Sequence, residues 1–238
     1  MIRLSALVHP LTRNSAILLG SALSLALVAT NSLAEDIDPV SVFDEPNHRI
    51  IFTNDRVSVY RVDIMAKEDT ATLFHYHEND QLTVLTRDSS GYDQRQGGEP
   101  ERFDAPRGTM LFTVYSAVKA VPHQITVPAG EQFGVVGVEF LAAPSSDMAR
   151  LVSPPDEPEF VTPRSTVQRL TLEGEAPLPA GALLVSLGDY ALTVKEQDAP
   201  TDWKAARGAV YWVDSNATGA TISAAEPAQL IVIPVRQK

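Results

Sequence analysis

Short stretches of β-branched or alternating residues recur along the chain from residue 50 onward. Turn-forming residues separate them, as at 88–91, 97–100 and 128–130. Short strands at regular spacing with such punctuation are typical of a β-sandwich or a β-barrel. We therefore predict an all-β fold whose first half has strands at 50–52, 57–64, 81–85, 109–115, 124–127 and 133–140.

The second half of the chain has the same rhythm, with strands predicted at 167–172, 182–187, 190–194, 209–213, 220–223 and 229–235. Residues 105–114 align with 205–213, and 135–140 align with 230–235, which suggests an internal duplication. Prolines at 144, 154, 155, 158 and 163 lie between the halves. Because proline removes backbone donors, we predict that 144–164 is an acidic linker rather than a strand, between domains at 35–143 and 165–238.

The first 34 residues have the pattern of a secretory signal peptide. They contain Arg3 and Arg13 but no acidic residue, and they carry an apolar run at 16–29 and small residues up to Ala34. We predict cleavage after Ala34 and a periplasmic or secreted protein. The alternative is an uncleaved anchor helix, for which the run is short, since a membrane span needs about 20 apolar residues. After cleavage we expect no stable membrane anchoring.

Charge and cysteine content exclude several classes of function. The chain has 19 basic and 30 acidic residues, a net charge of −11 and no cysteine. Such acidity argues against a nucleic-acid partner, because phosphate binding requires a basic face. The absence of cysteine excludes disulfide scaffolds, Cys-ligated zinc, iron–sulfur clusters and a catalytic thiol. The remaining classes are small-molecule enzymes, binding modules and interaction proteins with an acidic surface.

The candidate chemistry is carried by histidines. His75 and His77 are two residues apart, so in an extended strand both imidazoles point to the same face, as in a chelating pair for a divalent metal. His123 opens a later strand that could run beside the first one in a barrel. A surface or core pair is the alternative for the H-x-H motif alone. His48 has polar neighbours on both sides and is expected to be a solvated loop residue.

These residues resemble the cupin superfamily. Its first motif runs G-x5-H-x-H-x(3,4)-E-x6-G, and its second runs G-x5-P-x-G-x2-H-x3-N. His75 and His77 match the first motif, whereas His123 and Gly108 match the second. The resemblance covers about residues 48–142 and, weakly, 165–236. It implies a cupin jelly-roll barrel followed by a second, degenerate cupin-like β-domain, with one metal inside the first barrel.

The motifs are incomplete in this chain. Gln81 stands where the family has its glutamate, and it could coordinate through its carbonyl oxygen, hold a metal-bound water or do neither. The site implied by the resemblance is thus His75, His77, His123 and Gln81, binding iron, manganese, nickel, copper or zinc. In the second half, Ala220 aligns with His123, and no histidine follows residue 123. That half is expected to be structural.

Three functions remain open. Three neutral imidazoles leave a divalent metal with its full charge and with open positions, which suits Lewis-acid chemistry. Because cupins with three histidines include oxygenases, the resemblance implies a metal-dependent oxygenase that acts on a small organic molecule. The alternatives are a non-catalytic cupin that binds a metal or a small molecule, and an interaction protein. Cupin barrels often pair through their sheets, so a homodimer is possible.

Overall fold

The computed structural model describes residues 38–115, 121–141, 150–197 and 199–235. The chain divides into two units, Met1–Asp36 and Ile37–Lys238, and all described residues belong to the second unit. These residues form strands, turns and loops without an α-helix, which confirms the all-β prediction. Consequently, the described part has no helix long and apolar enough to cross a membrane. The predicted signal peptide and its cleavage point lie outside the described residues.

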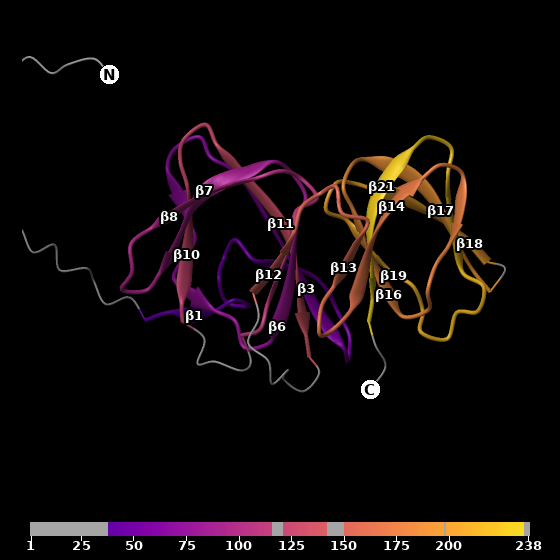
Figure 1. The fold of residues 1–238 in the computed structure, drawn as a ribbon, viewed down its shortest axis with the longest axis horizontal. Helices are drawn as coiled ribbons and strands as arrows, with labels where there is room; N and C mark the ends of the chain where they lie inside the picture. The colour runs from indigo at the N-terminus through magenta and orange to yellow at the C-terminus, as the bar shows by residue number, and fades with distance from the viewer. Residues whose placement is uncertain (1–37, 116–120, 142–149, 198, 236–238) are drawn as a thin grey trace, which may run out of the picture. The chain divides into compact units, whose positions relative to one another are not determined.

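The first half is built from two facing sheets, seen in indigo to magenta in Figure 1. One sheet, here called the site sheet, has the order β1 (Val40–Ser41), β5 (His75–Tyr76), β10 (His123–Val127), β7 (Ser89–Arg95) and β8 (Glu101–Ala105), with β4 (Thr70–Ala71) also on β10. The other, the inner sheet, has the order β12 (Arg150–Ser153), β9 (Met110–Thr113), β6 (Asp80–Leu85), β11 (Gln132–Phe140), β3 (Val57–Met65) and β2 (Arg49–Thr53).

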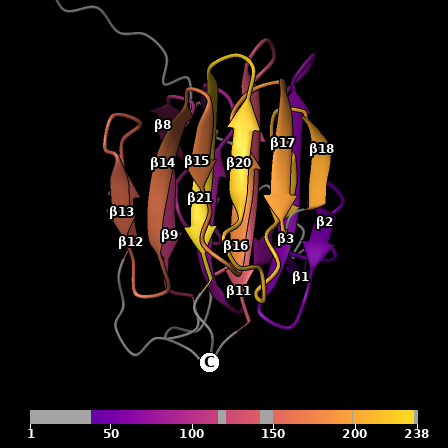
Figure 2. The ribbon, with the colours of Figure 1, turned by 90° about the vertical axis from the view of Figure 1, so that its right-hand side faces the viewer.

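The second half also consists of two sheets. One has the order β13 (Glu159–Val161), β14 (Thr166–Leu172), β21 (Ala228–Pro234), β16 (Ala182–Ser186) and β19 (Val210–Trp212). The other has the order β15 (Glu175–Pro177), β20 (Thr221–Ala224), β17 (Tyr190–Glu196) and β18 (Ala199–Ala205). Figure 2 views the molecule from this side, with β17, β18 and β20 toward the viewer.

The strand pairing of the second half repeats that of the first. β11 lies between β6 and β3, as β21 lies between β16 and β14, and β7 pairs with β8 and β10, as β17 pairs with β18 and β20. The turns correspond as well. The Arg107 N–H donates to Asp88 Oδ1 at 2.8 Å, and the Arg207 N–H donates to Asp189 Oδ1 at 2.9 Å. Residues of β6, β7, β10 and β11 can therefore be matched with those of β16, β17, β20 and β21.

The segment predicted as a linker contributes two strands, which corrects the expectation that it forms none. β12 pairs with β9 of the first half, and β13 pairs with β14 of the second half. Pro154, Pro155 and Pro158 lie between β12 and β13, where no backbone N–H has to donate a hydrogen bond to a neighbouring strand. Phe160 of β13 is buried and joins the core, which explains why this short segment is ordered into a strand.

Three hydrophobic clusters hold the fold together. One fills the first half between its two sheets, and a second fills the second half. The third, here called the shared core, contains Phe112 and Phe140 from the inner sheet together with Leu183 and Ile231 from the second half. The inner sheet is therefore buried on both faces, which agrees with the nearly continuous apolar sequence of β11.

A candidate three-histidine metal centre

The structure brings the three predicted histidines together. His75 lies on β5 and pairs directly with His123 on β10, and His77 directly follows the end of β5. One nitrogen atom from each of the three rings lies within 4.8 Å of the others. The Nε2 atoms of His77 and His123 are 3.2 Å apart. His75 and His77 are buried, and His123 is partly buried.

Each ring is held through its Nδ1 atom. The Nδ1 of His75 is 2.9 Å from the carbonyl oxygen of Leu73. The Nδ1 of His77 is 2.8 Å from Glu139 Oε1, and that of His123 is 2.9 Å from Asp93 Oδ1. The Leu73 carbonyl can only accept, and the carboxyl groups of Glu139 and Asp93 accept in their ionised form. Each Nδ1–H then donates, and each Nε2 keeps its lone pair for a cation. This chemistry of the donor set fits a divalent transition metal.

Burial favours the neutral imidazoles that a metal requires. Burial and the neighbouring His123 lower the pKa of His75 to about 3. The same causes lower the pKa of His77 well below its usual value. Both rings are therefore neutral near pH 7, and no proton has to be displaced before they bind a cation.

Glu139 and Asp93 are functional residues that the sequence did not reveal. Burial raises the pKa of Glu139 to about 8, whereas a cation on the adjacent His77 would favour the carboxylate form. A fully buried glutamate within the apolar run of β11 was the signal that could have found it. Asp93 lies among polar residues and gave no such signal.

Gln81 lies next to Glu139 and Tyr60, beside the histidine cluster. It faces Glu139 across β6 and β11, and its Nε2 donates to the Tyr60 hydroxyl and, at 2.9 Å, to Thr83 Oγ1. An atom added at the Cβ position of Gly137 would come within 2.0 Å of Tyr60 Cζ, so this glycine makes room for the ring. The amide nitrogen is thus engaged within the protein, and coordination through Oε1 stays a prediction.

His48 is not a solvated loop residue, which corrects the expectation from its polar neighbours. Only 8% of its surface is exposed, and its ring centroid lies 4.5 Å from that of His75. A hydrogen bond of 2.5 Å joins its Nδ1 to Glu45 Oε2, within a turn closed by its backbone N–H and the Glu45 carbonyl. Tyr115 stacks on His77, with 4.6 Å between the ring centroids.

The second half has apolar residues at the positions that match His123, Asp93, Glu139 and Gln81. Asp93 pairs with Ile125 as Val194 pairs with Ile222, so Val194 takes the place of Asp93. Ala220 precedes Ile222 by two residues, as His123 precedes Ile125. By the same register, Pro234 and Ala182 replace Glu139 and Gln81. The matched interior is apolar and cannot hold a metal through histidine.

Comparison with known proteins shows similarity in structure alone. No family model matches the sequence, and neither does any curated protein. A protein from E. coli called Ylba, of family model DUF861, has a TM-score of 0.57 at 8% identity, over 82% of this chain and 85% of its own. The bacterial pirin YhhW from E. coli, in complex with nickel(II), has a TM-score of 0.54 at 12% identity, over 80% and 91%. A mutant salicylate 1,2-dioxygenase from Pseudoaminobacter salicylatoxidans, in complex with gentisate, has a TM-score of 0.53 at 12% identity, over 83% and 76%.

Proposed function

The chain has the cupin fold, and from this premise we propose that it is an exported protein that binds one divalent transition metal and uses it as a metal-dependent oxygenase on a small organic molecule. One observation carries the metal site: the Nδ1 atoms of His75, His77 and His123 are all held by acceptors, so three Nε2 atoms remain for one ion. The nickel-bound pirin and the dioxygenase among the structural neighbours support this assignment.

The donor set fits iron, nickel, copper, zinc or manganese, and the affinity of such a site for divalent ions rises from manganese through iron and nickel to copper. A bound metal would supply Lewis acidity and, for a redox-active ion, electron exchange with oxygen. The protein orients the three rings, and it places the carboxylates of Asp93 and Glu139 behind two of them. These carboxylates offset part of the charge of the ion, which three neutral ligands leave uncompensated.

A non-catalytic module that binds a metal or a small molecule is the second candidate. It is favoured by the fact that Glu139 Oε1 and Asp93 Oδ1 are both engaged with histidine rings, so that each carboxyl group serves to hold a ring. Tyr115 is also a poor acid near pH 7, because burial raises its pKa to about 12. Metal-dependent oxygen consumption with enolisable or thiol substrates would support the oxygenase, whereas tight binding without turnover would support the module.

The metal site is tested by elemental analysis of protein purified without chelators. We expect about one equivalent of metal per chain, and stoichiometric binding should be lost in His75→Ala and in His123→Ala. His48→Gln is the matched control, because His48 is also buried beside His75 but offers no atom to the cluster. Full metal content in His123→Ala would remove that residue from the site, and no uptake by the wild type would refute the proposal.

Export is tested separately. If residues 1–34 are a signal peptide, N-terminal sequencing of protein recovered from the periplasm or the medium should begin at Glu35. Retention of Met1 in that fraction would contradict cleavage, and absence of the protein from it would contradict export.

A further inference from the structure

Two arginines lie in register with the residues of the proposed metal centre. On the site sheet, Arg95 of β7 pairs with His123 of β10, which in turn pairs with His75 of β5. Cross-strand partners in antiparallel strands point to the same face, with Cβ atoms about 5 Å apart. Asp93 precedes Arg95 by two residues, therefore shares its face, and holds the His123 ring. Arg95 thus belongs to the row of side chains that forms the site.

The inner sheet also has a row of paired residues that ends in an arginine. Arg150 of β12 pairs with Thr113 of β9, Thr113 pairs with Gln81, and Gln81 pairs with Glu139. Glu139 contacts His77, so this row faces the metal centre. All of these pairings are antiparallel, and Arg150 therefore points to the face that carries Glu139. Both arginines are exposed, whereas the residues further along each row are buried or partly buried.

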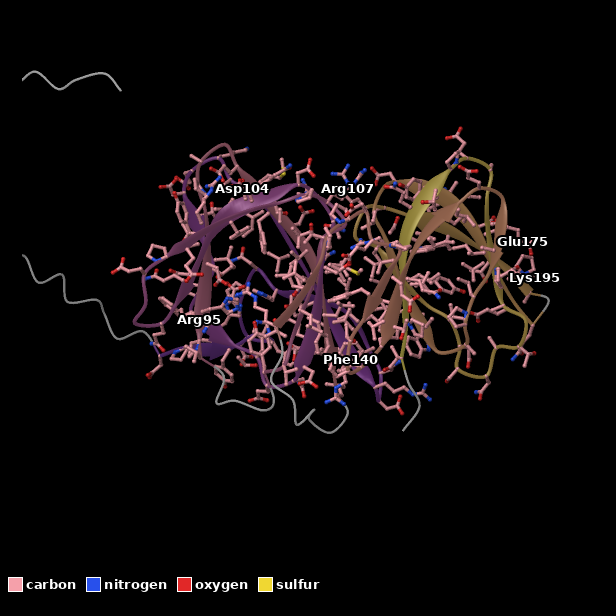
Figure 3. The ribbon with its side chains drawn as sticks, viewed as in Figure 1. Arg95, Asp104, Arg107, Phe140, Glu175 and Lys195 are labelled. Atoms are coloured by element: carbon pink, nitrogen blue, oxygen red, sulfur yellow. The ribbon has the colours of Figure 1, made fainter. Side chains whose placement is uncertain are left out.

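The two rows meet at the histidines, because the Nε2 atom of His77, the ring that Glu139 holds, lies 3.2 Å from the Nε2 atom of His123, the ring that Asp93 holds. The charges of Arg150 and Arg95 both lower the pKa of Asp93, which agrees with this placement by register. Neither arginine forms an ion pair within the described part of the chain, in contrast to Arg102, which pairs with Asp104 and Glu131. Figure 3 labels Arg95 at the end of β7.

We propose that Arg95 and Arg150 form an anion-binding pair at the edge of the metal centre, which selects ligands that carry a carboxylate group. The proposal rests on the function proposed above, because it names the class of ligand that the metal centre would take. Guanidinium groups bind carboxylates through paired, charge-assisted hydrogen bonds. In a chain with a net charge of −11, two cations beside one site attract an anion that the rest of the surface repels.

The test compares benzoate with benzamide, its neutral analogue of similar shape, as probes for the zinc-loaded and the metal-free protein. Ligand-observed NMR titration gives the dissociation constants. We expect the wild type to bind benzoate at least about 10-fold more tightly than benzamide, and each of Arg95→Gln and Arg150→Gln to weaken benzoate binding about 10-fold. Benzamide binding should stay unchanged. The conservative Arg95→Lys should bind benzoate more tightly than Arg95→Gln but less tightly than the wild type. Lysine keeps the charge but lacks the planar guanidinium group that donates two parallel hydrogen bonds.

Arg102→Gln is the matched control. It removes the same charge from the same sheet, but its guanidinium is already paired, so benzoate affinity should remain at the wild-type value. Equal benzoate affinity in the wild type and in the double variant of Arg95 and Arg150 would overturn the proposal. Zinc content is measured for every sample. A wild type that takes up no zinc refutes the metal site, whereas the metal-free titration still decides whether the arginines bind the anion.

Discussion

At the scale of single residues, the candidate site depends on groups that hold the ligands as much as on the ligands themselves. Three different acceptors, a backbone carbonyl and two carboxylates, fix the three imidazoles through Nδ1. The sequence predicted the histidines, because residues two apart in a strand, such as His75 and His77, point to the same face. It did not predict Asp93 or Glu139, because their roles arise from the contact of strands that are far apart along the chain.

Removal of either carboxylate should weaken metal binding without abolishing it. Asp93→Asn and Glu139→Gln keep the shape of the side chain but lose the charge that stabilises the donating Nδ1–H. We expect metal affinity to fall about 10- to 100-fold in each variant. Competition with a chromophoric chelator measures this change. Asp104→Asn, a change on an exposed residue of β8, should leave the affinity unchanged. Wild-type affinity in both site variants would show that the carboxylates do not support the ligands.

Glu45 should make stability depend on pH in the acid range. Burial raises its pKa, but hydrogen bonds with His48, Asn47 and the Leu73 N–H outweigh this effect and lower the pKa from 4.5 to about 2. A lowered folded-state pKa stabilises the protein above about pH 4.5, and this stabilisation is lost as the pH falls toward 2.

Urea unfolding of metal-free protein at pH 7 and pH 3 tests this expectation. Between these pH values the wild type should lose about 2 kcal/mol more of its free energy of unfolding than Glu45→Gln does. Other carboxyl groups titrate in the same range, and comparison with the variant isolates the share of Glu45. Parallel pH profiles for the two proteins would argue against a lowered pKa.

At the scale of elements, strands with apolar runs could be predicted, whereas polar strands could not. The predicted segments 57–64 and 133–140 agree closely with β3 and β11, both of which are largely buried. β8 and β18 were missed, because they are mostly exposed and their sequences have no apolar alternation. The turn expected at 88–91 overlaps the start of β7 at Ser89. There, Ser-Ser-Gly continues into a strand because β8 and β10 supply its partners on both sides.

The contact between β11 and β3 depends on a glycine in the middle of a buried strand. Gly137 lies opposite Tyr60, and its missing side chain leaves the space that the phenol ring occupies. Gly137→Ala should lower the free energy of unfolding by about 1–3 kcal/mol through overpacking, as thermal unfolding of the metal-free protein would show. Gly98→Ala is the control, since its added methyl would make only ordinary contacts. An equally small effect of both substitutions would contradict the packing argument.

At the scale of the whole molecule, the two halves share a core and hold each other by reciprocal contacts. Arg169 of β14 donates to the carbonyl oxygens of Gly108 and, at 2.6 Å, of Pro154. In the opposite direction, Arg107 donates to the Leu187 carbonyl at 3.3 Å, at the border of the halves that Figure 3 shows. The sequence suggested two matching halves but not this interface, because alternation identifies buried faces without saying which faces meet.

The shared core implies that the two halves unfold together. Both tryptophans lie in the second half, and Trp212 stacks on Phe52 of β2. Their fluorescence therefore reports on the second half and on its border with the first, whereas far-UV circular dichroism reports on strands of both halves. Because Phe112 and Ile231 belong to one cluster, loss of either half exposes the core of the other. We expect the two signals to give the same urea midpoint in metal-free wild-type protein, as in a two-state transition. Ile231→Ala removes part of that cluster and should lower both midpoints equally, with a loss of about 2–5 kcal/mol. A fluorescence midpoint separate from the dichroism midpoint in the wild type would mean that the shared core does not couple the halves.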